Sequence, residues 1–189
     1  TTHADRAAQY ALVTAAEPPL AQNAEPLIRR TADGFRLDPG PLAIHVCRDA
    51  FALPGRVTLP GDDQAALNPG HAQIVLADGT VLRAGAPERL RIETNGPLRG
   101  VIRVEGHYVD DKHQPRMAYR LRLTVYRGRA DVRVQWTIGN DHTADMLTEV
   151  SSASLRIPIP QAGGITAALA HGGETEISEN AALELLQDY

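Results

Sequence analysis

Three segments in the middle of the chain, at 101–109, 117–126 and 131–138, alternate apolar and polar residues with a period of two. This alternation is typical of β-strands that turn one face to the core and the other face to solvent. The polar stretch at 110–116 and the turn at 127–129 would join the segments as successive hairpins. The pattern therefore predicts a three-stranded antiparallel meander with one buried face.

Shorter strands are predicted on both sides of the meander, because brief apolar runs alternate with Gly, Pro, Asp and Asn turn signals. Their expected positions are 42–47, 57–59, 73–76, 80–82, 90–94 and 154–159, with a last short strand pair bracketed by Gly163-Gly164 and Gly172-Gly173. Asp78-Gly79 is expected to close a hairpin. The sequence shows no long amphipathic helix, and we predict an all-β fold, an antiparallel β-barrel or sandwich of roughly ten short strands.

The predicted domain boundary lies at residue 27. Residues 1–26 are Ala-rich with few large apolar groups, and we expect a loose N-terminal lead-in in which Pro18-Pro19 stops any helix. Residues 27–189 are predicted to form a single β-domain, since a chain of 189 residues suits one domain. The chain begins at Thr1 and stops after ALELLQDY, so we expect a segment of a larger protein.

The polar face of the meander carries arginine at four positions. If the strands pair as hairpins, one side of the sheet holds Arg103, Arg120, Arg122 and Arg133, with His107 near the same edge. Guanidinium groups match carboxylates with two parallel hydrogen bonds, so this face is a candidate binding surface for an acidic sugar or an acidic partner. The alternative is a solvated face whose arginines pair across strands with Glu105 and Asp131.

Trp136 shares the apolar side of its strand with Val132, Val134 and Ile138. An exposed tryptophan would suggest a platform for sugar stacking, but this parity places the indole in the core. We therefore expect Trp136 to be buried, and its truncation to alanine to cost on the order of 3–5 kcal/mol.

Composition and motifs exclude several classes of protein. The net charge of −4 argues against a nucleic-acid partner, and no apolar run approaches the length of a membrane span. The chain contains no phosphate-binding loop, dinucleotide fingerprint, zinc-protease motif or nucleophile elbow. We therefore expect no catalytic residue and no cofactor in this segment.

The sequence also gives no sign of a metal site. The histidines are scattered, and the acid pairs Asp62-Asp63 and Asp110-Asp111 are expected to be solvated turn residues. His107, Lys112 and His113 lie close together in sequence. They could act as a base with a cationic neighbour, but we prefer the interpretation that they belong to a solvent-exposed loop. Cys47 is the single cysteine and cannot form an internal disulfide, so it is interpreted as a small filler residue.

A series of phrases resembles one known module. They are GFRLDPGPLAIHVCRDAFALPGRV, IETNGPLRGVIRVEGHYVDD, AYRLRLTVYRGRADVRVQWTI, SLRIPIP and a late LLQD. In this order they resemble the N-terminal β-barrel domain, a RIFT-type barrel, of the exo-rhamnogalacturonan lyase family. The family's strand patterns correspond to Gly96–Gly106, Arg120–Gly128 and Val132–Ile138. Gln135-Trp136 stands where the family more often has an acid–His pair.

The resemblance implies a part of a carbohydrate-active enzyme. Members of the family are thought to cleave acidic pectin backbones by β-elimination, with the catalytic groups on a separate helical domain that would follow this segment. The resemblance therefore implies a non-catalytic β-domain of a bacterial polysaccharide lyase, secreted or periplasmic rather than cytoplasmic, whose partner is that following domain. Two alternatives stay open, a self-standing module that binds an acidic oligosaccharide and a purely structural domain for interdomain packing.

Overall fold

The computed structural model describes residues 25–62, 65–141, 147–158, 166–171 and 174–179, and it contains strands without helices in these ranges. The all-β prediction is confirmed. No helix of the described residues is long and apolar enough to cross a membrane. Most of the predicted lead-in, up to residue 24, lies outside the described residues. Residues 181–187, which the sequence predicts as a strand or short helix, also lie outside them.

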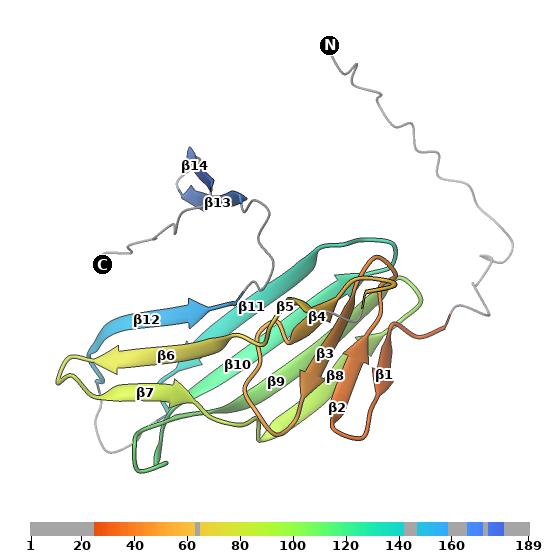
Figure 1. Ribbon diagram of the computed structural model, residues 1–189. Coiled ribbons are helices and arrows are strands. Elements are labelled where there is room, and N and C mark those ends of the chain that lie inside the picture. Colours follow the sequence, from red (N-terminus) through yellow and green to blue (C-terminus); the bar gives the residue numbers. More distant parts are fainter. Residues whose placement is uncertain (1–24, 63–64, 142–146, 159–165, 172–173, 180–189) are drawn as a thin grey trace, which may run out of the picture.

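The strands form two large antiparallel sheets (Figure 1). The five-stranded sheet follows chain order, with β1 (Ile28–Arg30), β2 (Gly34–Leu37), β3 (Ala43–Cys47), β4 (Arg56–Thr58) and β5 (Ala65–Leu67). The larger sheet curls into a half-barrel in the order β11 (Val132–Gly139), β10 (Pro115–Tyr126), β9 (Arg99–Val109), β7 (Val81–Ala84), β6 (His71–Leu76) and β12 (Val150–Arg156), and β8 (Arg89–Asn95) also pairs with β9. A separate pair contains β13 (Thr166–His171) and β14 (Glu174–Glu179).

The predicted meander is β9, β10 and β11, in antiparallel register throughout. The hairpin at Asp78-Gly79 joins β6 to β7, where Gly79 has a φ of 85° and the Asp78 carboxylate accepts a hydrogen bond from the Thr80 amide at 2.9 Å. The last strand of the larger sheet, β12, starts and ends earlier than expected. It ends before Pro158, because proline has no amide hydrogen to donate to the ladder. β13 lies between the two glycine pairs as predicted, whereas its partner β14 follows the second pair.

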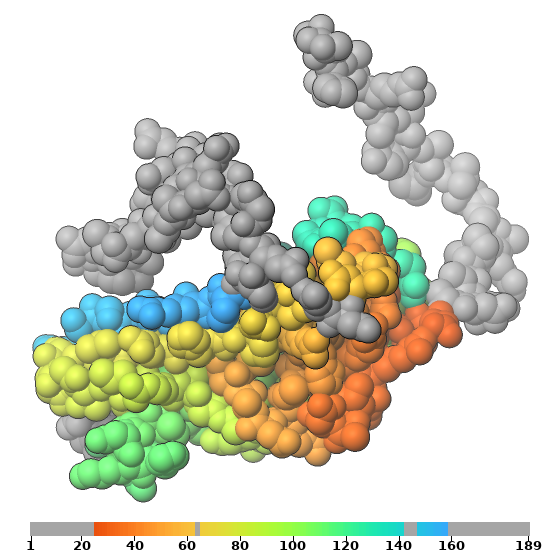
Figure 2. Space-filling view, viewed as in Figure 1, coloured from red at the N-terminus to blue at the C-terminus, as the bar shows by residue number. Residues whose placement is uncertain are grey.

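The core lies between the five-stranded sheet and the curled sheet. In β9 the even positions from Ile102 to Tyr108 are buried, and in β10 the odd positions from Met117 to Val125 are buried, as the alternation predicted. Side chains of the first sheet complete this core, namely Leu27, Ile28, Phe35, Leu37, Ile44, Val46 and Val57. Figure 2 shows the orange N-terminal strands packed directly against the yellow and green strands of the larger sheet. The fold is therefore a two-layer β-structure of the sandwich or half-barrel kind.

A side-chain amide connects the two sheets at the start of β1. Asn95, the last residue of β8, accepts a hydrogen bond from the Ile28 amide at 3.0 Å and donates one to the Ile28 carbonyl at 2.8 Å. The amide thus satisfies both backbone groups of a strand end that has no strand neighbour on that side.

The expectation of full burial for Trp136 is wrong, although its side was predicted correctly. The indole packs against the core cluster and donates a hydrogen bond from Nε1 to the Tyr108 hydroxyl at 2.9 Å, but it is only partly buried. The reason is topological, because β11 is the edge strand of its sheet and Val134 beside it is 38% exposed. Truncation of Trp136 should therefore cost less than the 3–5 kcal/mol typical of a fully buried large aromatic residue.

Candidate functional site

The outward positions of β8, β9, β10 and β11 form a densely charged surface, here called the charged face. Strand register places its side chains in rows across the sheet. One row contains Arg89, Glu105, Arg120 and Thr137, and the next contains Arg91, Arg103, Arg122 and Gln135. Arg133 lies opposite Thr124, one row further along β10. The sheet thus brings the four predicted arginines to one side, together with Arg89 and Arg91 of β8.

Two glutamates bridge the inner arginines of the charged face. Glu105 accepts hydrogen bonds from Arg103 at 2.9 Å and from Arg120 at 3.0 Å. Glu93 accepts one from Arg122 at 2.8 Å and a longer one from Arg103 at 3.4 Å. The hydrogen bond from Arg122 is the main cause that lowers the pKa of Glu93. Burial would raise the pKa of Glu105, but hydrogen bonds from both arginines bring it below its ordinary value.

The predicted partners of the arginines are correct in one case and wrong in the other. Glu105 does pair with arginines of the neighbouring strands, whereas Asp131 pairs with Arg129 at 2.5 Å and not with Arg133. Glu93, which occupies the outward parity of its strand, was not predicted as a partner. Its strand was predicted, but the pairing of that strand with β9 was not.

The pairing leaves positive charge available. The side chains of Arg89, Arg91 and Arg133 make no hydrogen bond or ion pair with any residue in the described part of the chain. Arg120 and Arg122 engage their carboxylates through Nε, so that the terminal amino groups of both side chains are free of partners among the described residues. The Nε of Arg103 is buried without a partner among these residues. The face therefore offers several guanidinium groups for an anion.

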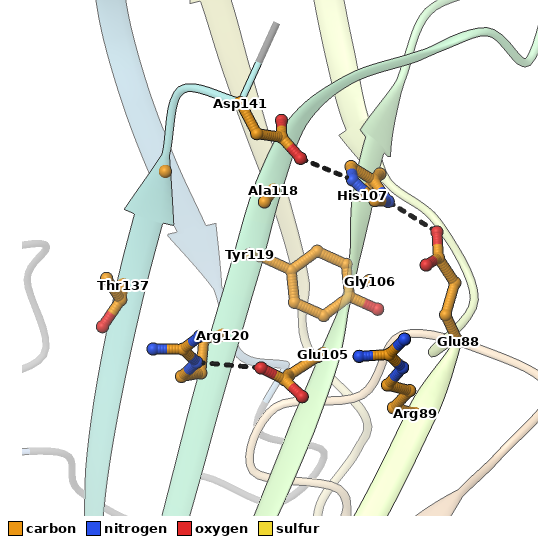
Figure 3. A pocket seen from close by; sticks show the side chains of 11 residues that line it. Glu88, Arg89, Glu105, Gly106, His107, Ala118, Tyr119, Arg120, Thr137 and Asp141 are labelled. Atoms are coloured by element: carbon orange, nitrogen blue, oxygen red, sulfur yellow. Dashed lines mark hydrogen bonds and ion pairs between the residues drawn. The ribbon is translucent and has the colours of Figure 1, made fainter.

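A hollow of about 330 Å³ opens at one end of the charged face (Figure 3). His107 lies between two carboxylates there, with Nδ1 at 2.5 Å from Glu88 and Nε2 at 2.8 Å from Asp141. Arg89, Arg120 and Thr137 line the hollow further along the sheet. Because both ring nitrogens face carboxylate oxygens, the arrangement favours the imidazolium form, which donates from both nitrogens.

A glycine of β9 lies next to His107 and lets Tyr119 pack close to the strand. A Cβ at Gly106 would lie 2.6 Å from the Tyr119 hydroxyl, so the absent side chain leaves room for the tyrosine. Tyr119 in turn donates a hydrogen bond to the Gly85 carbonyl at 2.9 Å, which fixes the ring. Neither Lys112 nor His113 lines the hollow, so the base with a cationic neighbour considered from the sequence is not assembled there.

The pKa of His107 should make stability depend on pH. The hydrogen bond to Glu88 is the main cause that raises this pKa, and Asp141 adds to it, while burial opposes both. A raised pKa in the folded state stabilises the protein at pH values below the unfolded pKa, and this contribution is lost as pH rises through the folded value. The free energy of unfolding should therefore fall as pH rises above about 6.5, the ordinary pKa of histidine, and through the raised pKa of His107.

Urea unfolding of the wild type and of a His107→Gln variant at several pH values tests this expectation. Glutamine keeps hydrogen-bonding capacity but cannot ionise, so its curve should be flatter across the same window. Identical pH dependence in the two proteins would show that another group is responsible.

A second polar cluster lies on the five-stranded sheet. His45 Nε2 is 3.1 Å from an oxygen of Asp33, His45 Nδ1 is 3.7 Å from the Cys47 sulfur, and the other oxygen of Asp33 is 3.9 Å from that sulfur. Burial is the main cause that raises the pKa of the Cys47 thiol, and the charges of Asp33 and Asp49 add to it. From the sequence, Cys47 was interpreted as a small filler residue. Its spacing of two residues from His45 nevertheless placed both side chains on one face of the strand.

Comparison with known families was informative for the larger sheet. Residues 80–165 match the family model described as the PcRGLX-like protein central beta sandwich domain, which spans the described strands from β7 to β12. No curated protein matches the chain. The match confirms the resemblance to a β-domain of the exo-rhamnogalacturonan lyase family, and its description as a sandwich agrees with the structure. It names a central domain, so the N-terminal position and the RIFT-type barrel are not shown.

Proposed function

We propose that this chain is the non-catalytic β-domain of a polysaccharide lyase that acts on acidic pectin-type glycans, and the match of residues 80–165 to the PcRGLX-like central beta sandwich model supports this proposal. We further propose that the charged face binds uronate groups of the glycan. Its site would contain Arg103, His107, Arg120, Arg122 and Arg133, together with Arg89 and Arg91. Bacterial origin and a secreted or periplasmic location stay predictions.

The observation that carries this proposal is the excess of unpaired guanidinium groups on one sheet face. The whole chain has a net charge of −4, yet arginines outnumber carboxylates on the charged face. The terminal amino groups of Arg120 and Arg122 are free among the described residues, and these are the donors that recognise a carboxylate with two parallel hydrogen bonds. A purely solvated face would be expected to use its arginines within itself.

The spacing of the arginines suits a chain of acidic sugars. Neighbouring strands lie about 4.8 Å apart, and residues on one face repeat about every 6.8 Å along a strand. Successive guanidinium groups on this lattice can therefore reach carboxylates on successive sugar residues. The hollow at His107 has a volume of about 330 Å³ and would accept a single sugar ring.

The role assigned to this domain is binding and not chemistry. β-elimination requires a base, and His107 is held between Glu88 and Asp141 in a setting that raises its pKa. An imidazolium cannot abstract a proton, so this setting argues against His107 as the base of the reaction. The proposal therefore assigns the catalytic groups and a packing partner to another domain of the same protein.

Calorimetric titration with oligogalacturonides at low salt tests the proposal. We expect weak binding that decreases as salt is added, because the contacts are between exposed charges. An Arg120→Ala, Arg122→Ala double variant should bind at least about tenfold more weakly, since a hydrogen bond to a charged group contributes about 1.5–3 kcal/mol.

A matched control keeps this experiment specific. An Arg29→Ala, Arg36→Ala double variant removes the same charge from exposed positions on the five-stranded sheet, and its affinity should not change. An Arg120→Lys, Arg122→Lys variant should bind more weakly than the wild type, because an ammonium group cannot form the paired hydrogen bonds of a guanidinium. Absence of binding at millimolar ligand would refute the glycan role and would support the structural alternative, a domain whose function is interdomain packing.

A further inference from the structure

The cluster of Asp33, His45 and Cys47 combines three kinds of donor at one place on the five-stranded sheet. His45 and Cys47 share the outer face of β3, and Asp33 belongs to the turn that leads into β2. One donor atom from each residue lies within 4.8 Å of the others. The cluster precedes residues 80–165, so the family match says nothing about it, and it does not depend on the glycan proposal.

The hairpin geometry explains how the three side chains meet. Gly34 pairs with Cys47 across the β2–β3 ladder, and the absence of a Cβ at Gly34 lets the strand approach the Val46 carbonyl closely. The Arg48 amide donates a hydrogen bond to the Asp33 carbonyl at 2.8 Å, which holds the turn against the end of β3. These backbone contacts hold the turn, and with it Asp33, close to Cys47.

The distances suit a tetrahedral metal ion. A Zn–S bond of about 2.3 Å and a Zn–N bond of about 2.0–2.1 Å at a tetrahedral angle place sulfur and nitrogen about 3.5 Å apart. The cluster has 3.7 Å between the Cys47 sulfur and His45 Nδ1, and 3.9 Å between that sulfur and an Asp33 oxygen. Small side-chain adjustments would bring the three donors to bonding distance around one ion.

Charge also favours a cation at this position. An Asp33 carboxylate oxygen lies 3.9 Å from the Cys47 sulfur, and a divalent ion bound between a carboxylate and a thiolate offsets their mutual repulsion. The same repulsion argues against a nucleophilic Cys–His–Asp arrangement, which needs positive surroundings to hold a thiolate. Two arginines lie opposite His45 on the neighbouring strands, Arg36 on β2 and Arg56 on β4. Both already have partners, because Arg36 lies 3.5 Å from Asp38 and Arg56 also interacts with another residue.

We infer that Asp33, His45 and Cys47 form a binding site for a divalent cation of the zinc class. Thiolate, imidazole and carboxylate together select Zn²⁺ over the oxygen-seeking Mg²⁺ and Ca²⁺. Three protein ligands leave the fourth position to water. Thr31 supports the site, because its hydroxyl donates to Asp33 at 2.9 Å and lies 3.4 Å from His45 Nε2. Such outer contacts orient metal ligands.

Cobalt(II) titration of the reduced 189-residue chain tests the inference. Cys47 is the only cysteine, so a thiolate-to-cobalt absorption band in the near ultraviolet must come from this residue. We expect the band to saturate at one Co²⁺ per chain and to disappear when Zn²⁺ displaces the cobalt. The melting temperature should rise with Zn²⁺, because a ligand that binds the folded state stabilises it.

Variants separate a three-residue site from adventitious thiol binding. Cys47→Ser should abolish the band, and His45→Gln and Asp33→Asn should each weaken cobalt binding on the order of tenfold or more. His107→Gln is the matched control, because it removes the histidine that lies between Glu88 and Asp141, and it should leave the band unchanged. No band, an unchanged affinity in His45→Gln, or one ion held between two chains would each overturn the inference.

Discussion

Replacement of Tyr108 by alanine is expected to lower the free energy of unfolding by about 3–5 kcal/mol, the range for large buried aromatic residues. Tyr108 is fully buried, and its ring packs edge-to-face on Tyr119 with 5.7 Å between the centroids. Tyr119 makes a second such contact with Phe51 at 5.1 Å. Loss of the Tyr108 ring would thus open a cavity at one end of a chain of three aromatic rings, beside Tyr119.

The hydroxyl of Tyr108 has a separate role that a conservative variant isolates. It accepts the hydrogen bond from Trp136 Nε1 at 2.9 Å, and burial raises the pKa of Tyr108 to about 12. Tyr108→Phe keeps the ring and should cost only about 0.5–1.5 kcal/mol, the net value of one hydrogen bond. Urea unfolding followed by the fluorescence of Trp136, the only tryptophan, measures both variants. Equal losses in the two variants would contradict the importance assigned to ring packing.

Much of the larger sheet could be predicted because its strands have one buried face. In β9 and β10 every outward or inward assignment from Ile102 to Tyr108 and from Met117 to Leu123 follows a period of two. The hairpin turns are local, so the antiparallel order of the meander and the common side of its arginines followed from the sequence. These features depend on residues that are close along the chain.

The errors arise where tertiary arrangement decides. Trp136 has the correct parity, but the exposure of an edge strand depends on which strands assemble beside it. Glu93 reaches Arg103 and Arg122 where the β8–β9 register shifts, between positions 92 and 94, and a period of two does not reveal such a shift. The same holds for the turn residue Asp33, which reaches His45 and Cys47 across a hairpin.

The two candidate sites use the two sheets differently. The charged face spreads over neighbouring strands of the curled sheet and offers several cations to an extended ligand. The metal cluster occupies one end of a hairpin and offers three donors to a single ion. Variants of one site should leave the other intact, because effects at separated positions without shared partners are close to additive.

The second large effect is expected at Gly34, where alanine should destabilise the fold and also disrupt the metal cluster. A Cβ there would lie 2.0 Å from the Val46 carbonyl oxygen and 3.1 Å from Cys47 Cα. These are backbone atoms of the paired strand, so the clash cannot be relieved by a side-chain rotation. Overpacking of this kind typically costs about 1–3 kcal/mol, and more where backbone must shift. Separation of β2 from β3 would also carry Asp33 away from His45 and Cys47, so Co²⁺ binding should weaken.

Gly96→Ala is the matched control for this prediction. The nearest atom to a Cβ at Gly96 is the Arg99 carbonyl oxygen at 3.7 Å, an ordinary contact distance. This variant should change the free energy of unfolding by no more than about 0.5 kcal/mol, as surface substitutions usually do. Urea unfolding and cobalt absorption measured on both variants give two independent outcomes. Wild-type stability in Gly34→Ala would contradict the close approach of β2 to β3. A destabilised Gly34→Ala with unchanged cobalt affinity would instead show that the position of Asp33 does not depend on that approach.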